Sequence, residues 1–297
     1  MNRSTANAND LMVRQIDLYG TELENILGKD VLGIFGSLYF GAETLIKDAV
    51  QQRALNGSKR DGLAVVLETG GGFVEVVQRI VDILRQHYTV VDFIIPDFAM
   101  SAGTVLVMSG DAIHMNYFSI LGPIDPQVPR TDGQGFLPAL GYLEQYQRMI
   151  EKDKKGELST VEATFFVTKF DPAELYSFEQ AKNLSITLLK EWLVQYKFKN
   201  WTKTSSKGTP VTLEMKKARA ETIGEQLNDT KRWYSHGRGI SMQVLQRDLN
   251  LLIDDYGWTG EKYNKISNYH GLMRDYMGRL GNLGAIHTAG FYAPWIG

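Results

Sequence analysis

Apolar residues in the first half of the chain fall into runs that alternate between strand and helix patterns. Residues 63–67 (LAVVL) form a continuous apolar run, which is typical of a strand buried on both faces. Residues 73–84 place apolar side chains three and four positions apart and predict an amphipathic helix. Residues 90–96 predict a second strand, residues 101–108 a short apolar helix, and residues 112–117 a third strand. This alternation predicts an α/β fold of βαβ units with a parallel sheet.

The second half of the chain has a mainly helical pattern. Residues 139–155 predict one helix, and residues 171–199 predict a long amphipathic helix that begins with Asp as N-cap and Pro in the first turn. Residues 211–255 predict two or three further helices, and the Gly- and Tyr-rich end of the chain has no clear period. We therefore divide the chain into a disordered tail (1–10), an α/β core (11–138), a helical extension (139–256) and an irregular C-terminal tail (257–297).

Composition narrows the class of protein. Lys and Arg total 32 and Asp and Glu total 34, so the net charge of −2 argues against a general nucleic-acid binder. The absence of cysteine excludes a disulfide framework, a thiolate metal site and a cysteine nucleophile. No stretch approaches the ~20 apolar residues that cross a bilayer, and the N-terminus lacks the apolar core of a secretory signal. We expect a cytoplasmic protein with no membrane anchor in this chain.

A glycine turn directly follows the first predicted strand. The glycines of residues 69–72 (TGGG) allow a sharp turn with amides pointing outward near a helix start, where they can bind a phosphate or an oxyanion. Residues 73–75 (FVE) do not complete the dinucleotide fingerprint, and no Gly-Lys-Ser/Thr follows to make a P-loop. A turn with only a structural role stays open.

Small residues surround a serine after the second predicted strand, in residues 100–104 (MSAGT). Ser101 at a helix N-terminus is either a plain N-cap or a nucleophile whose developing charge the helix end favours, with the Ala102 amide free to donate. Because the carboxyl ends of parallel strands meet at one edge of a sheet, we expect the glycine turn and Ser101 to converge.

These segments, together with residues 121–127 (LGPIDPQ), resemble the serine dehydrogenase proteinase family. Its members are relatives of signal peptide peptidase A within the Clp protease and crotonase superfamily. The resemblance continues through three more motifs and covers most of residues 60–256; these motifs are residues 171–175 (DPAEL), 196–201 (YKFKNW) and 235–240 (SHGRGI). It implies a Clp/crotonase-like fold and a serine peptidase that works through an acyl-enzyme.

The resemblance also implies roles for single residues. Ser101 is the implied nucleophile, and the implied oxyanion hole consists of backbone amides of Gly71 or Gly72 together with Ala102. Clp-type peptidases use a histidine soon after the serine, and residues 121–127 contain none.

Because a serine hydroxyl needs an adjacent base, the identity of that base is the open question. Relatives of signal peptide peptidase A use a lysine before the long helix, and the matching residue is Lys169. Its apolar neighbours favour the dehydrated setting that lowers a lysine pKa; a solvated surface lysine is the alternative. Lys152 and His236 are alternative bases.

We predict a Ser-Lys peptidase that acts on polypeptides, needs no cofactor or metal, and forms a homo-oligomer, as the family's assembly into rings or dimers implies. Two other interpretations stay open. An acyl-CoA-processing enzyme would use Glu68 and Asp125 as carboxylates beside the same amides. A catalytically inactive scaffold or binding protein would use its helical half to recruit partners.

Overall fold

A seven-stranded sheet lies at the centre of the fold. The computed structural model describes residues 7–55, 57, 59–125, 127–129, 136–204 and 207–295. The strands stand in the spatial order β10 (Asp254–Asp255), β5 (Ala112–Met115), β3 (Val90–Ile94), β2 (Gly62–Glu68), β1 (Asp30–Phe35), β11 (Gly284–Thr288) and β12 (Phe291–Trp295). The first five are parallel, and β11 and β12 join antiparallel at the edge of β1. The predicted α/β fold with a parallel sheet is confirmed.

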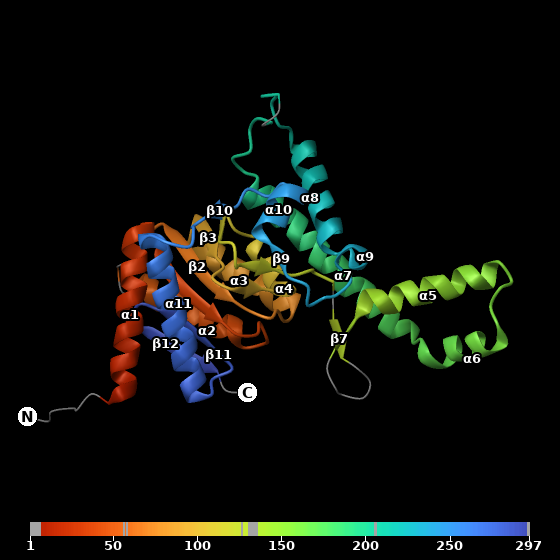
Figure 1. The fold of residues 1–297 in the computed structure, drawn as a ribbon, viewed down its shortest axis with the longest axis horizontal. Coiled ribbons are helices and arrows are strands. Elements are labelled where there is room, and N and C mark those ends of the chain that lie inside the picture. The colour runs from red at the N-terminus through yellow and green to blue at the C-terminus, as the bar shows by residue number, and fades with distance from the viewer. Residues whose placement is uncertain are drawn as a thin grey trace, which may run out of the picture.

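Helices cover both faces of this sheet (Figure 1). Helices α1 (Ala8–Leu27) and α11 (Glu261–Leu280) lie side by side on one face, while α2 (Ala42–Leu55) and α3 (Val74–His87) pack on the other. Successive strand residues point to opposite faces, so Val31 and Phe35 join the core under α1 and α11, whereas Leu32 and Ile34 join the core under α2 and α3. The apolar runs of the sequence are continuous because both faces are buried.

A second, three-stranded sheet lies beyond the carboxyl edge of the large one. It consists of β4 (Phe98–Ala99), β6 (Ile120–Leu121) and β9 (Ile240–Ser241), and the short helix α4 (Ala102–Val107) follows β4. A bridge between Thr69 and Ala99 connects the two sheets.

The remaining helices form the second half of the chain. They are α5 (Ala139–Lys154), α6 (Thr160–Lys169), α7 (Pro172–Trp192), a π-helical turn (Leu193–Lys197), α8 (Leu213–Leu227), α9 (Thr230–Trp233) and α10 (Met242–Asp248). The hairpin of β7 (Gln127–Pro129) and β8 (Phe136–Pro138) precedes them. Helices α5 and α6 and the first half of α7 project from the sheet as an arm (Figure 1). No helix in the described ranges combines the length and the apolarity needed to span a membrane.

Two of the predicted boundaries are wrong at the ends of the chain. Residues 257–297 are not an irregular tail, because α11, β11 and β12 form there and complete the sheet. The helix period of α11 is carried by buried Ile266, Tyr269, Met273 and Tyr276, and the partly polar rings of the two tyrosines hide it in the sequence. At the N-terminus, residues 8–10 already belong to α1, and a capping box between Asn7 and Asp10 starts the helix; residues 1–6 of the predicted tail lie outside the described residues.

Candidate active site

The glycine turn holds one amide that is free to bind a ligand. The Gly71 N–H donates to the Thr69 hydroxyl at 3.0 Å, so this amide is already used. Leu38 bridges Gly72 from the other side, because its N–H donates to the Gly71 carbonyl at 2.8 Å and its carbonyl accepts from Phe73 at 3.0 Å. Within the described part of the chain, the Gly72 N–H has no acceptor. Of the two glycines predicted for the oxyanion hole, Gly72 is therefore the one with a free donor.

Close contacts explain why this turn consists of glycines. Gly71 has a φ of +107°, and a Cβ there would lie 2.8 Å from the Ser101 Cβ. A Cβ on Gly72 would lie only 2.2 Å from the Leu38 carbonyl oxygen. The glycine turn and the serine turn are therefore in direct contact, as the sequence predicted from the shared edge of the sheet.

Ser101 stands in a strained strand-to-helix turn. Its φ of 54° and ψ of −123° are unusual for a residue with a side chain, and such strain gathers at functional sites. The half-buried side chain does not cap α4, so the plain N-cap interpretation is wrong. The N–H of Ala102, the first residue of α4, has no acceptor among the described residues. A hydroxyl and a free amide therefore stand beside the glycine turn.

Thr104 ties the serine turn to the next loop. Its buried hydroxyl lies 2.9 Å from the carbonyl oxygens of Ala99 and Gly122 and accepts the Gly122 N–H at 3.0 Å. The loop that starts at Gly122 continues to Ile124, whose N–H donates to the Leu227 carbonyl at 3.1 Å. Both ends of this short segment are thus fixed by hydrogen bonds.

The fixed loop presents Asp125 to His236. Asp125 Oδ1 lies 2.8 Å from His236 Nδ1, and the two side chains are 2% and 19% exposed. Strand β9 runs antiparallel to β6, and β6 runs parallel to β4, so the loop before β9 returns to the edge where β4 and β6 end. Gly239 permits this approach, because a Cβ there would lie 2.7 Å from Ile120 Cδ1. Ser101, Asp125 and His236 thus come from three segments that meet at one edge.

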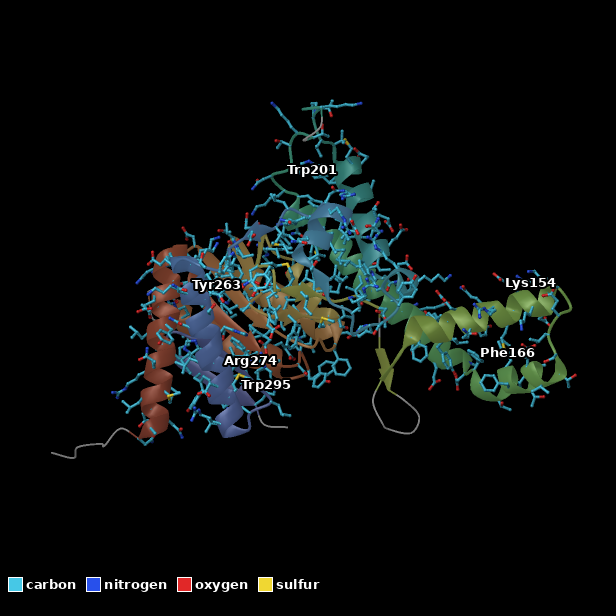
Figure 2. The ribbon with its side chains drawn as sticks, in the orientation of Figure 1. Lys154, Phe166, Trp201, Tyr263, Arg274 and Trp295 are labelled. Atoms are coloured by element: carbon cyan, nitrogen blue, oxygen red, sulfur yellow. The ribbon has the colours of Figure 1, made fainter. Side chains whose placement is uncertain are left out.

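The two lysine candidates lie on the arm. Lys152 pairs with Glu162 at 2.5 Å between α5 and α6, and its side chain is 40% exposed. Lys169 is the last residue of α6, and its side chain lies outside the described residues. Figure 1 shows α6 out along the arm, away from the three-stranded sheet, and Figure 2 labels Phe166 of the same helix there. Within a single chain, these lysines are not brought to Ser101.

A third lysine, Lys197, has an altered pKa that the sequence did not predict. Burial lowers the pKa of Lys197 to about 8, although the carboxylates of Asp254, Asp92 and Asp111 act in the opposite direction. Asp111 directly precedes β5, at the amino end of the parallel strands, whereas Ser101 follows the carboxyl end of β4. Lys197 is therefore not a member of this site.

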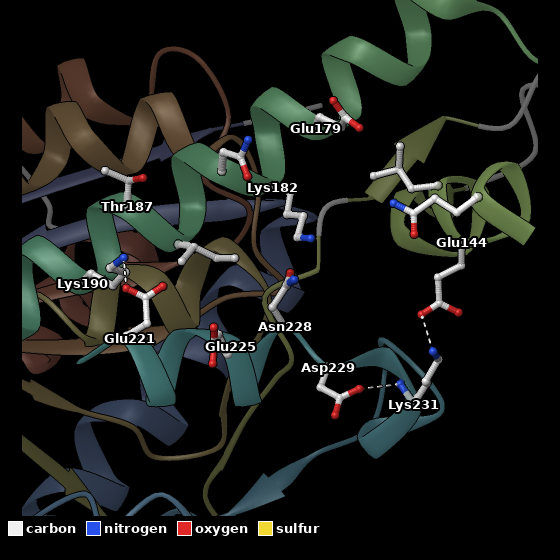
Figure 3. A pocket seen from close by; sticks show the side chains of 14 residues that line it. Glu144, Glu179, Lys182, Thr187, Lys190, Glu221, Glu225, Asn228, Asp229 and Lys231 are labelled. Carbon is white, nitrogen blue, oxygen red and sulfur yellow. Dashed lines mark hydrogen bonds and ion pairs between the residues drawn. The ribbon is translucent and has the colours of Figure 1, made fainter. Parts of the chain in front are cut away.

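A cavity in the helical half of the chain is separate from the serine turn. A space of about 810 Å³ lies between α5, α7 and α8, and Lys182, Glu225 and Asn228 are among the residues that line it (Figure 3). Neither Ser101 nor His236 lines it. The described residues contain no cluster of three or more metal-ligating side chains.

The fold and this edge define an α/β protein with a serine, a paired histidine and two amides without acceptors among the described residues, and such groups can carry out acyl transfer. The sequence was also compared with known protein families. Residues 27–224, two thirds of the chain, match the ClpP-like SDH-type serine proteinases. The chain belongs to this family.

Individual relatives add little about activity. An uncharacterized protein of Methanocaldococcus jannaschii, MJ0137, is 24% identical over 200 residues, 65% of each chain. A second one, MJ1495, is 34% identical over 88 residues, 30% of this chain and 28% of that protein. The chain thus spans less than two thirds of the length of either relative. Among solved structures, ClpP1 from Listeria monocytogenes aligns with a TM-score of 0.42 and 10% identity, over 79% of this chain and 95% of that one.

Proposed function

We propose that this protein is a serine peptidase that hydrolyses peptide bonds through an acyl-enzyme. Ser101 Oγ attacks the scissile carbonyl carbon while His236 accepts the hydroxyl proton. The amides of Gly72 and Ala102 hold the oxyanion. His236 then gives the proton to the leaving amine, and water repeats the sequence to release the acid. The observation that carries the proposal is the meeting of a strained serine, two unpaired amides and a His–Asp pair at one edge.

His236 replaces Lys169 as the first candidate for the base. Supporting this choice are the 2.8 Å contact with Asp125, which orients the imidazole, and the position of β9 beside β6. Lys169 of a neighbouring copy is the second candidate, because an arm of one chain can reach the edge of another only in a homo-oligomer. Lys152 is third, since Glu162 already holds its amine.

The polypeptide substrate has an apolar side chain near its scissile bond. Tyr39, Phe40 and Phe73 form an exposed aromatic cluster. The ring centroid of Phe73 lies 5.6 Å from that of Tyr39 and 5.0 Å from that of Phe40. Phe73 directly follows Gly72, and Leu38 directly precedes Tyr39. Exposed clusters of large apolar side chains are typical of binding surfaces.

The experiment is active-site labelling and turnover of the full chain. The wild-type protein, Ser101→Ala and the control Ser177→Ala on the arm are treated with a fluorophosphonate and assayed on a mixed peptide library. Ser101→Ala should lose labelling and at least ~10³-fold of turnover, while Ser177→Ala keeps both. Full activity of Ser101→Ala would refute the proposal. A wild-type protein without labelling or turnover would favour the scaffold, and stabilisation by acyl-CoA esters would favour the crotonase-like alternative.

A further inference from the structure

Helix α11 contacts the carboxyl edge of the sheet through two basic side chains one turn apart, His270 and Arg274. His270 Nε2 lies 2.5 Å from Glu68 Oε2, and the imidazole stacks on Phe35 with ring centroids 5.9 Å apart. One turn later, Arg274 Nη1 lies 3.0 Å from Asp97 Oδ2 and Nε lies 3.5 Å from Glu68 Oε1. Figure 2 labels Arg274 on this helix. Arg274 therefore links the carboxylate that ends β2 to the carboxylate that directly precedes β4.

Each contacted residue stands just before a segment of the candidate active site. Phe35 ends β1 and leads to Leu38, which bridges Gly72. Glu68 ends β2 and directly precedes the glycine turn. Asp97 directly precedes β4, which ends two residues before Ser101. Helix α11 thus contacts a residue just before each of the three segments, which are the one around Leu38, the glycine turn and the Ser101 turn.

The charges of these side chains have a second effect, beside the contacts themselves. The side chains of Glu68 and Asp97 are 12% and 22% exposed, so water screens them only partly. Unpaired carboxylates at the edge where an oxyanion forms would disfavour the new negative charge. His270 and Arg274 place positive or hydrogen-bonding groups on both carboxylates. Loss of Arg274 would therefore both loosen the two turns and leave negative charge beside the oxyanion hole.

We propose that His270 and Arg274 are positioning residues, which set the glycine turn and the Ser101 turn for catalysis through Glu68 and Asp97. This inference rests on the proposed peptidase function. It goes beyond it by assigning a role to α11, which lies outside the residues that match the family, 27–224.

A purely structural role and a positioning role of Arg274 predict different changes in kcat and KM. We would compare the wild-type protein with Arg274→Gln, Arg274→Lys and the control Arg279→Gln. Among the residues that the structure describes, Arg279 pairs with Asp275 of the same helix, at 2.6 Å. Arg274→Gln should lower kcat roughly 10–100-fold, as expected for loss of transition-state interactions, with KM changed less than about 2-fold. Affinity for a peptide boronate should fall in parallel with kcat/KM. Arg274→Lys should recover part of kcat, and Arg279→Gln should match the wild type.

A second carboxylate variant keeps the test decisive if Arg274→Gln fails to fold. Asp97→Asn removes the same contact with little change in shape, and it should lower kcat without changing KM. In the double variant Asp97→Asn/Arg274→Gln, the loss should be smaller than the product of the two single losses, because no unpaired carboxylate remains at Asp97. An unchanged kcat in both single variants, in a protein that Ser101→Ala inactivates, would overturn the positioning role and leave the peptidase proposal intact. Full activity of Ser101→Ala would instead overturn the peptidase proposal itself.

Discussion

The carboxyl edge of the sheet and the arm both carry candidate catalytic residues, but the two regions hold them very differently. At the edge, the turns are fixed to each other by backbone hydrogen bonds and by the Thr104 hydroxyl, and they pack so closely that Gly71 and Gly72 have no space for a side chain. On the arm, a small aromatic cluster around Tyr146 and Phe166 joins the helices, and Val161 and Val167 are 79% and 80% exposed. Catalytic geometry must be held within about 0.5 Å. Only the edge offers that rigidity within one chain.

Ion pairs show the same difference. The His236–Asp125 pair has a carboxylate that is 2% exposed, so its geometry is set by the surrounding structure. The Lys152–Glu162 pair is 40% and 33% exposed, and exposed pairs of this kind contribute little. Four pairs of variants, each with one member on the arm and one in the α/β part of the fold, test this contrast.

The largest expected effect separates the two candidate bases. His236→Ala should lower kcat/KM by about 10²–10⁴-fold, because a general base is lost. Lys169→Ala should stay within about 2-fold of the wild type, since α6 lies along the arm. For each variant, peptide turnover at saturating substrate gives kcat, and turnover at low substrate gives kcat/KM. The reverse result would move the base to the arm of a neighbouring copy, and size-exclusion chromatography with light scattering would then have to show an oligomer.

A smaller but still large effect is expected at the glycine turn. Gly72→Ala places a Cβ 2.2 Å from the Leu38 carbonyl oxygen, so the turn must shift and the oxyanion donor moves with it. A loss of about 10²-fold in kcat is expected for a displaced donor. Gly156→Ala on the arm is the matched control: its φ is +69°, nothing lies within 4 Å, and the cost should be about 1 kcal/mol of stability without loss of activity. Equal activity of both variants would contradict the proposed oxyanion hole.

The aromatic cluster should affect substrate preference rather than chemistry. Phe73, 47% exposed beside Gly72, is compared with Phe165 on the arm, which is 50% exposed. Phe73→Ala should raise KM roughly 10-fold for peptides with a large apolar residue at the cleavage site, consistent with losing about 1.5 kcal/mol of apolar contact. Phe165→Ala should not change KM. Equal KM values for peptides with apolar and polar residues, in the wild type, would exclude a role of the cluster in specificity.

The last comparison concerns stability in acid rather than activity. Burial tends to raise the pKa of Asp92, but hydrogen bonds and charge from His114 and Lys29 outweigh it and lower the pKa. A hydrogen bond from Lys152 lowers the pKa of Glu162 on the arm to about 2, although this carboxylate is solvent-exposed.

A lowered folded-state pKa stabilises the protein above the unfolded pKa of about 4, and the gain is lost as pH falls through the folded value. Asp92→Asn should therefore cost about 2 kcal/mol near neutral pH and flatten the acid side of the stability curve. Glu162→Gln should change that curve much less, because water and salt screen its pair with Lys152 and reduce the stabilisation that the lowered pKa would otherwise give. Urea unfolding of the two variants between pH 7 and pH 3 distinguishes them. If the free energy of unfolding of Asp92→Asn fell more steeply with falling pH than that of the wild type, the lowered pKa of Asp92 would be contradicted.

Local sequence was enough to predict the parts of the site that lie within one strand-turn-helix segment. The apolar runs located β2 and β3, and the glycines and small residues located the turns that contact each other. The pairing of Asp125 with His236 was not predicted, because 111 residues separate them and no local pattern links the two. Helix α11 was not predicted because two of its four buried residues are tyrosines, whose partly polar rings weaken the apolar period.

The sequence by itself determined the α/β class, the glycine and serine turns and the family, because each of these depends on residues close together in the chain. The tertiary structure decided which amide stays free, which basic residue stands at the serine's edge and what the last forty residues do. These depend on the antiparallel return of β9 and on the packing of α11. Side chains distant in sequence meet only when the sheet is complete, and their free energies of interaction arise only then.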